Sequence, residues 1–137
     1  MNADYPFAKL TERIIAAAYS VHNTLGAEFL ESVYTNALQM ELRLTGLDAA
    51  LEVPIIVRYR EYVVGEFRAD MIVSNEVIVE IKAVTALTSI HDAQLVNYLI
   101  ATGRSIGLLI NFGRSVQVRR KIYSKNLRES AKSAKSA

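Results

Sequence analysis

FRADMIVSNEVIVEIK, residues 67–82, is the stretch of this sequence that decides its fold. It contains two apolar, β-branched runs, with Asp70 in the first run and Glu80 and Lys82 in the second. Such runs are typical of strands, and unpaired charge is costly to bury between strands. We therefore expect a β-hairpin whose two carboxylates share a divalent cation.

The length of the hairpin loop decides whether the acids meet. Ser74-Asn75-Glu76 is the polar break between the runs, and Asn tolerates the left-handed conformation that a three-residue loop needs. Such a loop makes these cross-strand pairs: Val73 with Val77, Ile72 with Ile78, and Asp70 with Glu80. Lys82 shares the face of the acids because alternate strand residues point the same way. A two-residue loop would instead put the two acids on opposite faces.

The alternative is a solvated edge hairpin in which Lys82 screens two surface acids, since strand acids are common on wet faces. Apolar residues on both faces argue against it. Ile72 and Ile78 share the face of the acids, whereas the other face carries Met71, Val73, Val77, Val79 and Ile81. Both faces are therefore expected to be buried.

Composition limits the classes of protein. A chain of 137 residues with 51% hydrophobic content can form a core of useful size. The net charge of +2 permits nucleic acid as a partner without requiring it. The absence of cysteine excludes disulfides and thiolate metal sites. No run has the length of a membrane span and none resembles a secretory signal, so we expect a cytoplasmic protein with no membrane partner.

Hydrophobic periodicity predicts an α/β protein with a short mixed β-sheet flanked by helices, in the order α-α-β-β-β-α-β. The expected helices are about 7–24, 29–44 and 89–102, the last capped by Ser89, and the expected strands are 51–59, 62–73, 77–84 and 106–112. Residues 116–123 have the pattern of one more strand. We expect one domain over residues 1–127 and a disordered basic tail over 128–137.

Polar side chains recur on the expected helices. Gln94 and Tyr98 share a face of the third helix because they are four residues apart, and His91 lies on the same face. That face could equally be solvated while Leu95 and Leu99 face the core. Glu31 on the second helix is a weak signal by itself, because helix glutamates are usually exposed.

With these residues in order, the chain resembles the PD-(D/E)XK nuclease superfamily. Asp70 followed by Glu80-Ile81-Lys82 matches its signature, and Gln94 to Tyr98 fits the Q-x-x-x-Y pattern of the RecB-like branch. Glu31 stands where that branch has a helix acid. Residues 25–34, LGAEFLESVY, resemble the name motif of the small GxxExxY family, as do HDAQ at 91–94 and LLINF at 108–112.

The resemblance implies a small restriction-endonuclease-like core and a metal-dependent nuclease, with DNA favoured over RNA as substrate. Asp70, Glu80 and the Ile81 carbonyl would bind Mg²⁺ (or Mn²⁺). The expected catalytic residues, which would orient water, stabilise charge or position the backbone, are Lys82, Glu31, Gln94 and Tyr98. Cations suited to phosphate contacts are Arg68, Arg119, Arg120 and Lys121. By analogy with the superfamily, a homodimer is one expected assembly.

Two positions depart from the patterns of these families. Glu28 stands where the GxxExxY motif has glycine, and Phe67 stands three residues before Asp70, where RecB-like nucleases often have glycine. Neither change removes a ligand or the lysine. Two other functions remain open, because fold does not fix function: a nucleic-acid-binding module that cleaves nothing, and a protein-interaction subunit.

Overall fold

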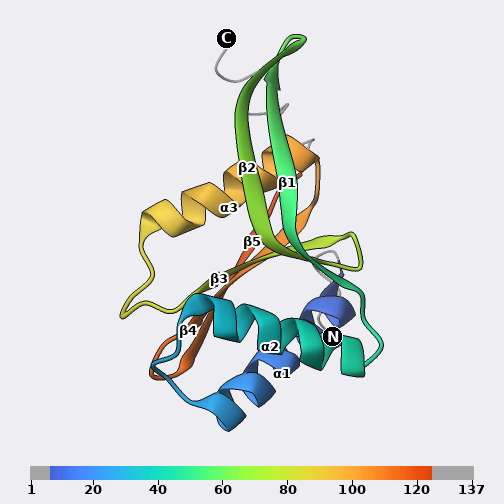
Figure 1. Cartoon of the computed structure of the whole chain (residues 1–137). Helices are drawn as coiled ribbons and strands as arrows, with labels where there is room; N and C mark the ends of the chain where they lie inside the picture. Colours follow the sequence, from blue (N-terminus) through green and yellow to red (C-terminus); the bar gives the residue numbers. More distant parts are fainter. Residues whose placement is uncertain (1–6, 125–137) are drawn as a thin grey trace.

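The computed structural model describes residues 7–124 (Figure 1). The elements are α1 (Ala8–Leu25), α2 (Glu31–Leu44), β1 (Ala49–Tyr59), β2 (Tyr62–Val73), β3 (Val77–Lys82), α3 (Ser89–Thr102), β4 (Ile106–Phe112) and β5 (Val116–Ile122). The expected order of elements is confirmed, with the additional strand present as β5. The basic tail expected at 128–137 lies outside the described residues. No described helix combines the length and apolar character that a membrane crossing would need.

The five strands form one mixed sheet in the order β1-β2-β3-β4-β5. β3 and β4 are parallel and joined through α3, whereas every other neighbouring pair is antiparallel. The helices lie on both sides of the sheet, with α1 and α2 on one side and α3 on the other (Figure 1). β1 is an edge strand and so accommodates Pro54, because proline has no N–H for a second neighbour.

Each face of the sheet has its own core. The α1–α2 face buries Met71, Val73, Val77, Val79 and Ile81 of the hairpin. The α3 face buries Ile72 and Ile78 against Leu95, Tyr98 and Leu99. The expectation that both faces of the hairpin are covered is therefore confirmed. The acids that share the face of Ile72 and Ile78 consequently point toward the α3 layer.

The β2–β3 hairpin has the expected register. Val73 pairs with Val77 and Ile72 with Ile78, which leaves the three residues 74–76 as the loop. Ser74 and Asn75 both adopt left-handed φ angles, 52° and 58°. Asn was expected to tolerate this conformation, and Ser74 also adopts it because the turn requires two such residues in succession.

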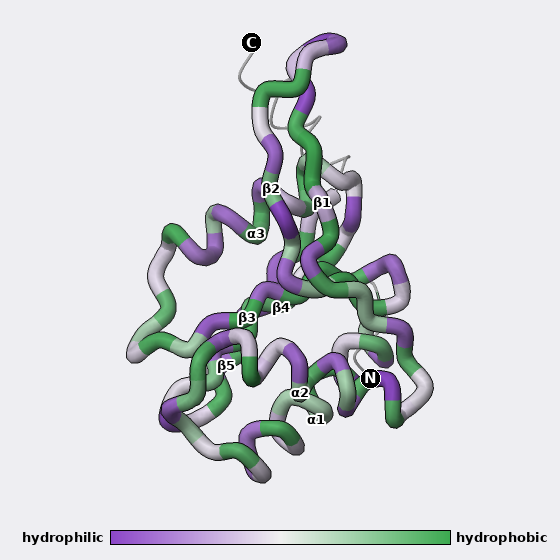
Figure 2. Tube along the Cα trace, in the orientation of Figure 1, coloured by the Kyte–Doolittle hydropathy of each residue, from purple (hydrophilic) through white to green (hydrophobic). Residues whose placement is uncertain are grey.

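β1 and β2 extend beyond the rest of the sheet as a two-stranded arm (Figure 1). Residues 60–61 form its turn, as expected. Figure 2 shows hydrophobic and hydrophilic residues interleaved along the arm. Several large apolar side chains there are exposed, including those of Tyr62, Val64 and Phe67.

Tyr34 fixes the connection between α1 and α2. Its ring is fully buried and stacks on Phe112 with the ring centroids 4.6 Å apart. Its hydroxyl donates to the Gly26 carbonyl at 2.6 Å and accepts from the Phe29 N–H at 3.2 Å. These two hydrogen bonds hold residues 26–29 outside either helix, which is why α2 begins at Glu31 and not at Phe29 as expected.

Two other boundaries differ from expectation. α3 is capped by Thr88 and not by Ser89, and the Thr88 N–H donates to His91 Nδ1 at 3.1 Å, so His91 serves the helix start. β3 ends at Lys82 and not at Val84, because the Asn111 carboxamide bonds both the N–H and the carbonyl of Val84 at 2.9 Å. Sequence periodicity cannot detect hydrogen bonds of this kind, in which a side chain bonds the backbone at the end of an element.

Glu28 has a φ of 82°, in the left-handed region that favours glycine. We predict that Glu28→Gly raises the free energy of unfolding by up to about 1 kcal/mol. The reason is that glycine removes the strain of a left-handed residue, and this gain exceeds the stability lost through the larger conformational entropy of glycine in the unfolded chain. Urea unfolding would measure the change. The matched control is Glu28→Ala, which removes the carboxylate but keeps the Cβ atom. Equal stability of the two variants would contradict the explanation.

Candidate functional site

The site lies where β2 and β3 separate. Their backbone ladder ends at the pair Met71 and Val79. At the next position the side chains replace it: the Asp70 N–H donates to Glu80 Oε2 at 2.7 Å, and the Ile81 N–H donates to Asp70 Oδ2 at 2.8 Å. Each carboxylate therefore bonds the backbone of the opposite strand. The structure brings the two acids together as the hairpin register required.

Both carboxyl groups are held away from water. Glu80 is only 3% exposed and Asp70 is half-buried. Burial, followed by the neighbouring Asp70 carboxylate, raises the pKa of Glu80 to about 8, against the opposing effects of the Asp70 N–H and Lys82. Burial also raises the pKa of Asp70, although the Ile81 N–H and then Lys82 oppose the change. Ionisation of both groups would place more negative charge here than Lys82 compensates, so Glu80 keeps a proton at neutral pH when no cation is bound.

Lys82 ends β3 two residues after Glu80. The residue is half-buried, and its charge favours the ionised forms of both acids. Lys82 pairs in register with Asn111, whose carboxamide fixes Val84 and hence the direction of the chain after β3. Asn111 is 1% exposed, and sequence reasoning assigned it no role, because an Asn in a hydrophobic strand has no distinctive spacing.

The donor set suits a hard divalent cation. One oxygen of each carboxylate accepts a backbone N–H, and within residues 7–124 no hydrogen bond engages Asp70 Oδ1 or Glu80 Oε1. The Ile81 side chain is packed in the α1–α2 core, so this residue could act only through its backbone. No group of three His, Asp or Glu side chains converges on a metal position in the described part of the chain. Mg²⁺ suits such a site, since it is commonly held by one or two carboxylates and completes its shell with waters and substrate phosphates.

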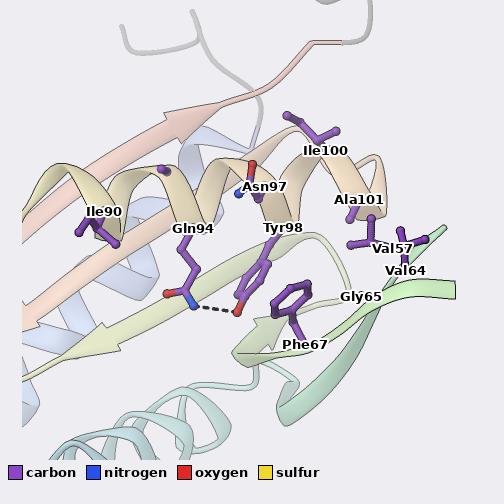
Figure 3. A pocket seen from close by; sticks show the side chains of 11 residues that line it. Val57, Val64, Gly65, Phe67, Ile90, Gln94, Asn97, Tyr98, Ile100 and Ala101 are labelled. Atoms are coloured by element: carbon purple, nitrogen blue, oxygen red, sulfur yellow. Dashed lines mark hydrogen bonds between the residues drawn. The ribbon is translucent and has the colours of Figure 1, made fainter. Parts of the chain in front are cut away.

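Gln94 and Tyr98 belong to α3, and Glu31 belongs to α2. Gln94 Nε2 donates to the Tyr98 hydroxyl at 3.0 Å, and Tyr98 is 5% exposed (Figure 3). Burial, with the charges of Glu80 and Asp70, raises the pKa of Tyr98, so its hydroxyl keeps its proton. Glu31 is exposed in the first turn of α2, and its charge adds to the rise in the pKa of Glu80.

Glu52 is a neighbour of the site that sequence reasoning missed. It lies on β1 between the pairs Leu51–Met71 and Val53–Ala69, across from Asp70, and its charge contributes to the raised pKa of Asp70. Its φ of 49° is unusual for a strand residue. The sequence has no signal for it, because an acid that alternates with apolar residues looks like an ordinary solvated strand position.

The expected phosphate-binding cations have different surroundings. Arg119 and Lys121 on β5 both form ion pairs with Asp92 of α3, with the Lys121 Nζ to Asp92 Oδ1 distance at 3.1 Å. Their charges are therefore partly neutralised within the fold. Arg120 lies between them on β5 and is half-buried. Arg68 is exposed on β2, two residues from Asp70, and forms no ion pair with another described residue.

Comparison with known proteins gives one family. The family described as the PD-(D/E)XK nuclease superfamily matches residues 8–122. No curated protein matches the sequence.

Two solved structures are similar to this chain. The crystal structure of SSO0001 superposes with a TM-score of 0.53 at 19% identity, over 93% of this chain and 64% of that chain, so this chain spans less than two thirds of its length. A crystal structure of an alkaline exonuclease, LHK-Exo, from Laribacter hongkongensis has a TM-score of 0.41 at 12% identity, over 90% of this chain and 87% of that chain. The likeness to SSO0001 shows a shared fold.

The raised pKa of Glu80 predicts that the metal-free protein loses stability as the pH rises. Folding lifts this pKa from 4.5 to about 8, so the folded protein holds a proton that the unfolded chain releases between those values. The contribution of Glu80 to stability is therefore greatest below about pH 4.5 and falls, by up to about 5 kcal/mol, as the pH rises to 8. Thermal unfolding in EDTA from pH 5 to 8 would measure it.

Glu80→Gln should remove most of this pH dependence, because the amide carries no proton that ionises in the range. Glu76→Gln, at an exposed position in the same hairpin, is the matched control and should keep the wild-type slope. An unchanged slope in Glu80→Gln would show that the buried carboxylate is not its source.

Proposed function

This chain belongs to the PD-(D/E)XK nuclease superfamily, and we propose that it is a metal-dependent nuclease that hydrolyses phosphodiester bonds, in DNA rather than RNA. The observation that carries the proposal is the pair of buried carboxylates at the separation of β2 and β3, followed by Lys82 on the same strand. Members of the superfamily generally use divalent metal ions, and the chemistry of this donor set agrees with that use.

Asp70, Glu80 and the Ile81 carbonyl would hold the cation, Mg²⁺ or Mn²⁺. When bound, it would supply Lewis-acid polarisation of a phosphodiester and a lower pKa for water. The raised pKa of Glu80 supports this assignment, because a bound cation would take the place of the proton that compensates the charge of the two acids in the metal-free protein.

The remaining roles follow from position. Lys82 would orient the attacking water or stabilise negative charge on the phosphate, because its charge acts on both acids. Tyr98, held by Gln94, would present a protonated hydroxyl to the same region. Glu31 would hold a water or a second ion at the outer side of the site.

We also propose the finer assignments to the RecB-like branch and the GxxExxY family. The hydrogen bond between Gln94 and Tyr98 supports the first, because it gives the Q-x-x-x-Y spacing a physical function. The φ of 82° at Glu28 supports the second, because the motif has glycine at a position whose backbone favours glycine. A homodimer remains a prediction, for which sedimentation velocity is the test.

Cation binding can be tested without a substrate. We predict that Mn²⁺ binding, followed by the loss of the free-ion signal in electron paramagnetic resonance, is weakened at least tenfold by Asp70→Asn or Glu80→Gln. The reason is that each amide removes one of two anionic ligands. Glu52→Gln tests the nearby acid and should have a smaller effect. Wild-type affinity in both ligand variants would exclude this pair as the metal site.

Cleavage tests the reaction itself. Labelled single-stranded, duplex and branched DNA and RNA would be incubated with Mg²⁺, Mn²⁺ or EDTA. We predict that cleavage requires the metal and falls about 100-fold or more in Lys82→Ala, in the range observed when one charge-stabilising donor is removed. Lys9→Ala, on the exposed side of α1, is the control and should cleave as the wild type does.

Metal binding without cleavage of any of these substrates would contradict the nuclease proposal. Binding of nucleic acid that weakens with salt would then select the module that binds without cutting.

A further inference from the structure

An uncharged groove lies beside the candidate site, between α3 and the β1–β2 arm (Figure 3). Its volume is about 520 Å³. The lining combines aromatic and aliphatic side chains with two carboxamides, and no charged residue takes part. The residues that matter to the argument are Gly65, Phe67, Gln94, Asn97, Tyr98 and Ala101.

Phe67 forms the aromatic wall of the groove. Phe67 is 49% exposed. Its ring nevertheless lies near the ring of Tyr98, with the two ring centroids 6.0 Å apart. Gly65 leaves room for this ring: a Cβ atom at Gly65 would lie 2.8 Å from Phe67 Cε2. The ring is therefore placed by its neighbours while much of it stays accessible, which is an arrangement suited to stacking.

The groove lies close to the paired carboxylates through Tyr98. Tyr98 and Gln94 line the groove, and the hydroxyl of Tyr98 is close enough to Glu80 and Asp70 for their charges to raise its pKa. Phe67 precedes Asp70 by three residues on β2. A group bound in the groove would therefore belong to a molecule that also passes close to Asp70 and Glu80.

The lining selects the chemistry of that group. Without a charged residue, the groove offers no opposite charge to a phosphate or to an ionised side chain, whereas its apolar walls suit a flat ring. Gln94 and Asn97 add amide groups that could bond the polar edge of such a ring, and Asn97 is exposed. An aromatic wall with nearby carboxamides matches the way in which proteins hold unstacked bases.

We infer that this groove binds an unpaired nucleobase, so that the substrate of the proposed nuclease is a single-stranded or locally unpaired nucleic acid. The inference rests on the proposed function for its ligand class. Bases within a continuous duplex are covered on both faces by their neighbours, and a base must leave the stack before Phe67 can contact it.

Binding in EDTA separates this inference from cleavage. Fluorescence anisotropy would compare three labelled probes: an oligothymidine of about 12 nucleotides, an abasic strand of the same length and charge, and a blunt duplex. The full chain should bind oligothymidine about tenfold more tightly than the abasic strand. Phe67→Ala should remove most of that difference and leave abasic binding unchanged.

Three further variants test the chemistry of the wall. Phe67→Trp should retain binding of oligothymidine, because it keeps an aromatic face, whereas Phe67→Leu should not. Ala101→Trp should weaken the same binding by filling the groove. Tyr19→Ala is the matched control, an aromatic of similar exposure on α1, across the sheet from α3. Thermal unfolding of each variant would verify that it is folded.

Several results would overturn the inference. One is equal binding of oligothymidine and the abasic strand. Another is full binding of oligothymidine by folded Phe67→Ala. A third is a wild-type dimer that Phe67→Ala converts to a monomer in sedimentation velocity, because a second copy would then occupy the groove. Cleavage that is insensitive to Phe67→Ala, with base-independent binding, would reject this inference and keep the nuclease. Base-dependent binding without cleavage would do the reverse.

Discussion

The structure depends on the exchange of hydrogen bonds at the point where β2 and β3 separate. Asp70 and Glu80 each accept a backbone N–H from the opposite strand, at 2.8 and 2.7 Å. Those N–H groups would otherwise be unsatisfied inside the protein, which is costly. The carboxylates thus complete the end of the ladder and allow β2 to continue with β1 into the arm while β3 continues with β4. The same two groups that end the pairing also define the candidate site.

This solution has an electrostatic cost. Two carboxylates in a poorly solvated position repel each other, and among the described residues Lys82 is the cation whose charge acts on both of them. Burial, followed by the charge of Asp70, outweighs Lys82 and leaves the pKa of Glu80 at about 8. A fold selected for stability alone would favour an uncharged pair, since buried ionic groups are seldom the most stabilising choice. A site for a cation gives the retained charge a physical reason, because the ion supplies the compensation that the side chains lack. The two acids that would bind a cation therefore lower the stability of the metal-free protein.

The separation of β2 from β3 also determines the groove. Because β2 continues with β1 beyond the sheet, its Phe67 faces α3 across a hollow and not across a packed layer. The helix contributes Tyr98 to the buried core and to the groove at once, so one residue links the packing of the α3 face with the region of the acids. Gly65 allows the ring of Phe67 to lie over it, because a Cβ atom at this position would force the ring to shift.

The sequence by itself determined the elements that depend on local pattern. The alternation of 67–82 and its polar break predicted the hairpin, its three-residue loop, both buried faces and the meeting of Asp70 with Glu80, because strand periodicity and loop length fix the register. The tertiary structure decided what depends on groups distant in sequence. Tyr34 shortens α2 through Gly26 and Phe29, Asn111 ends β3 through Val84, and Asp92 pairs with two of the expected phosphate-binding cations. The proximity of Glu52 to Asp70 and the groove at Phe67 also arise from tertiary packing. The amino-acid sequence contains no periodic pattern that would indicate either feature.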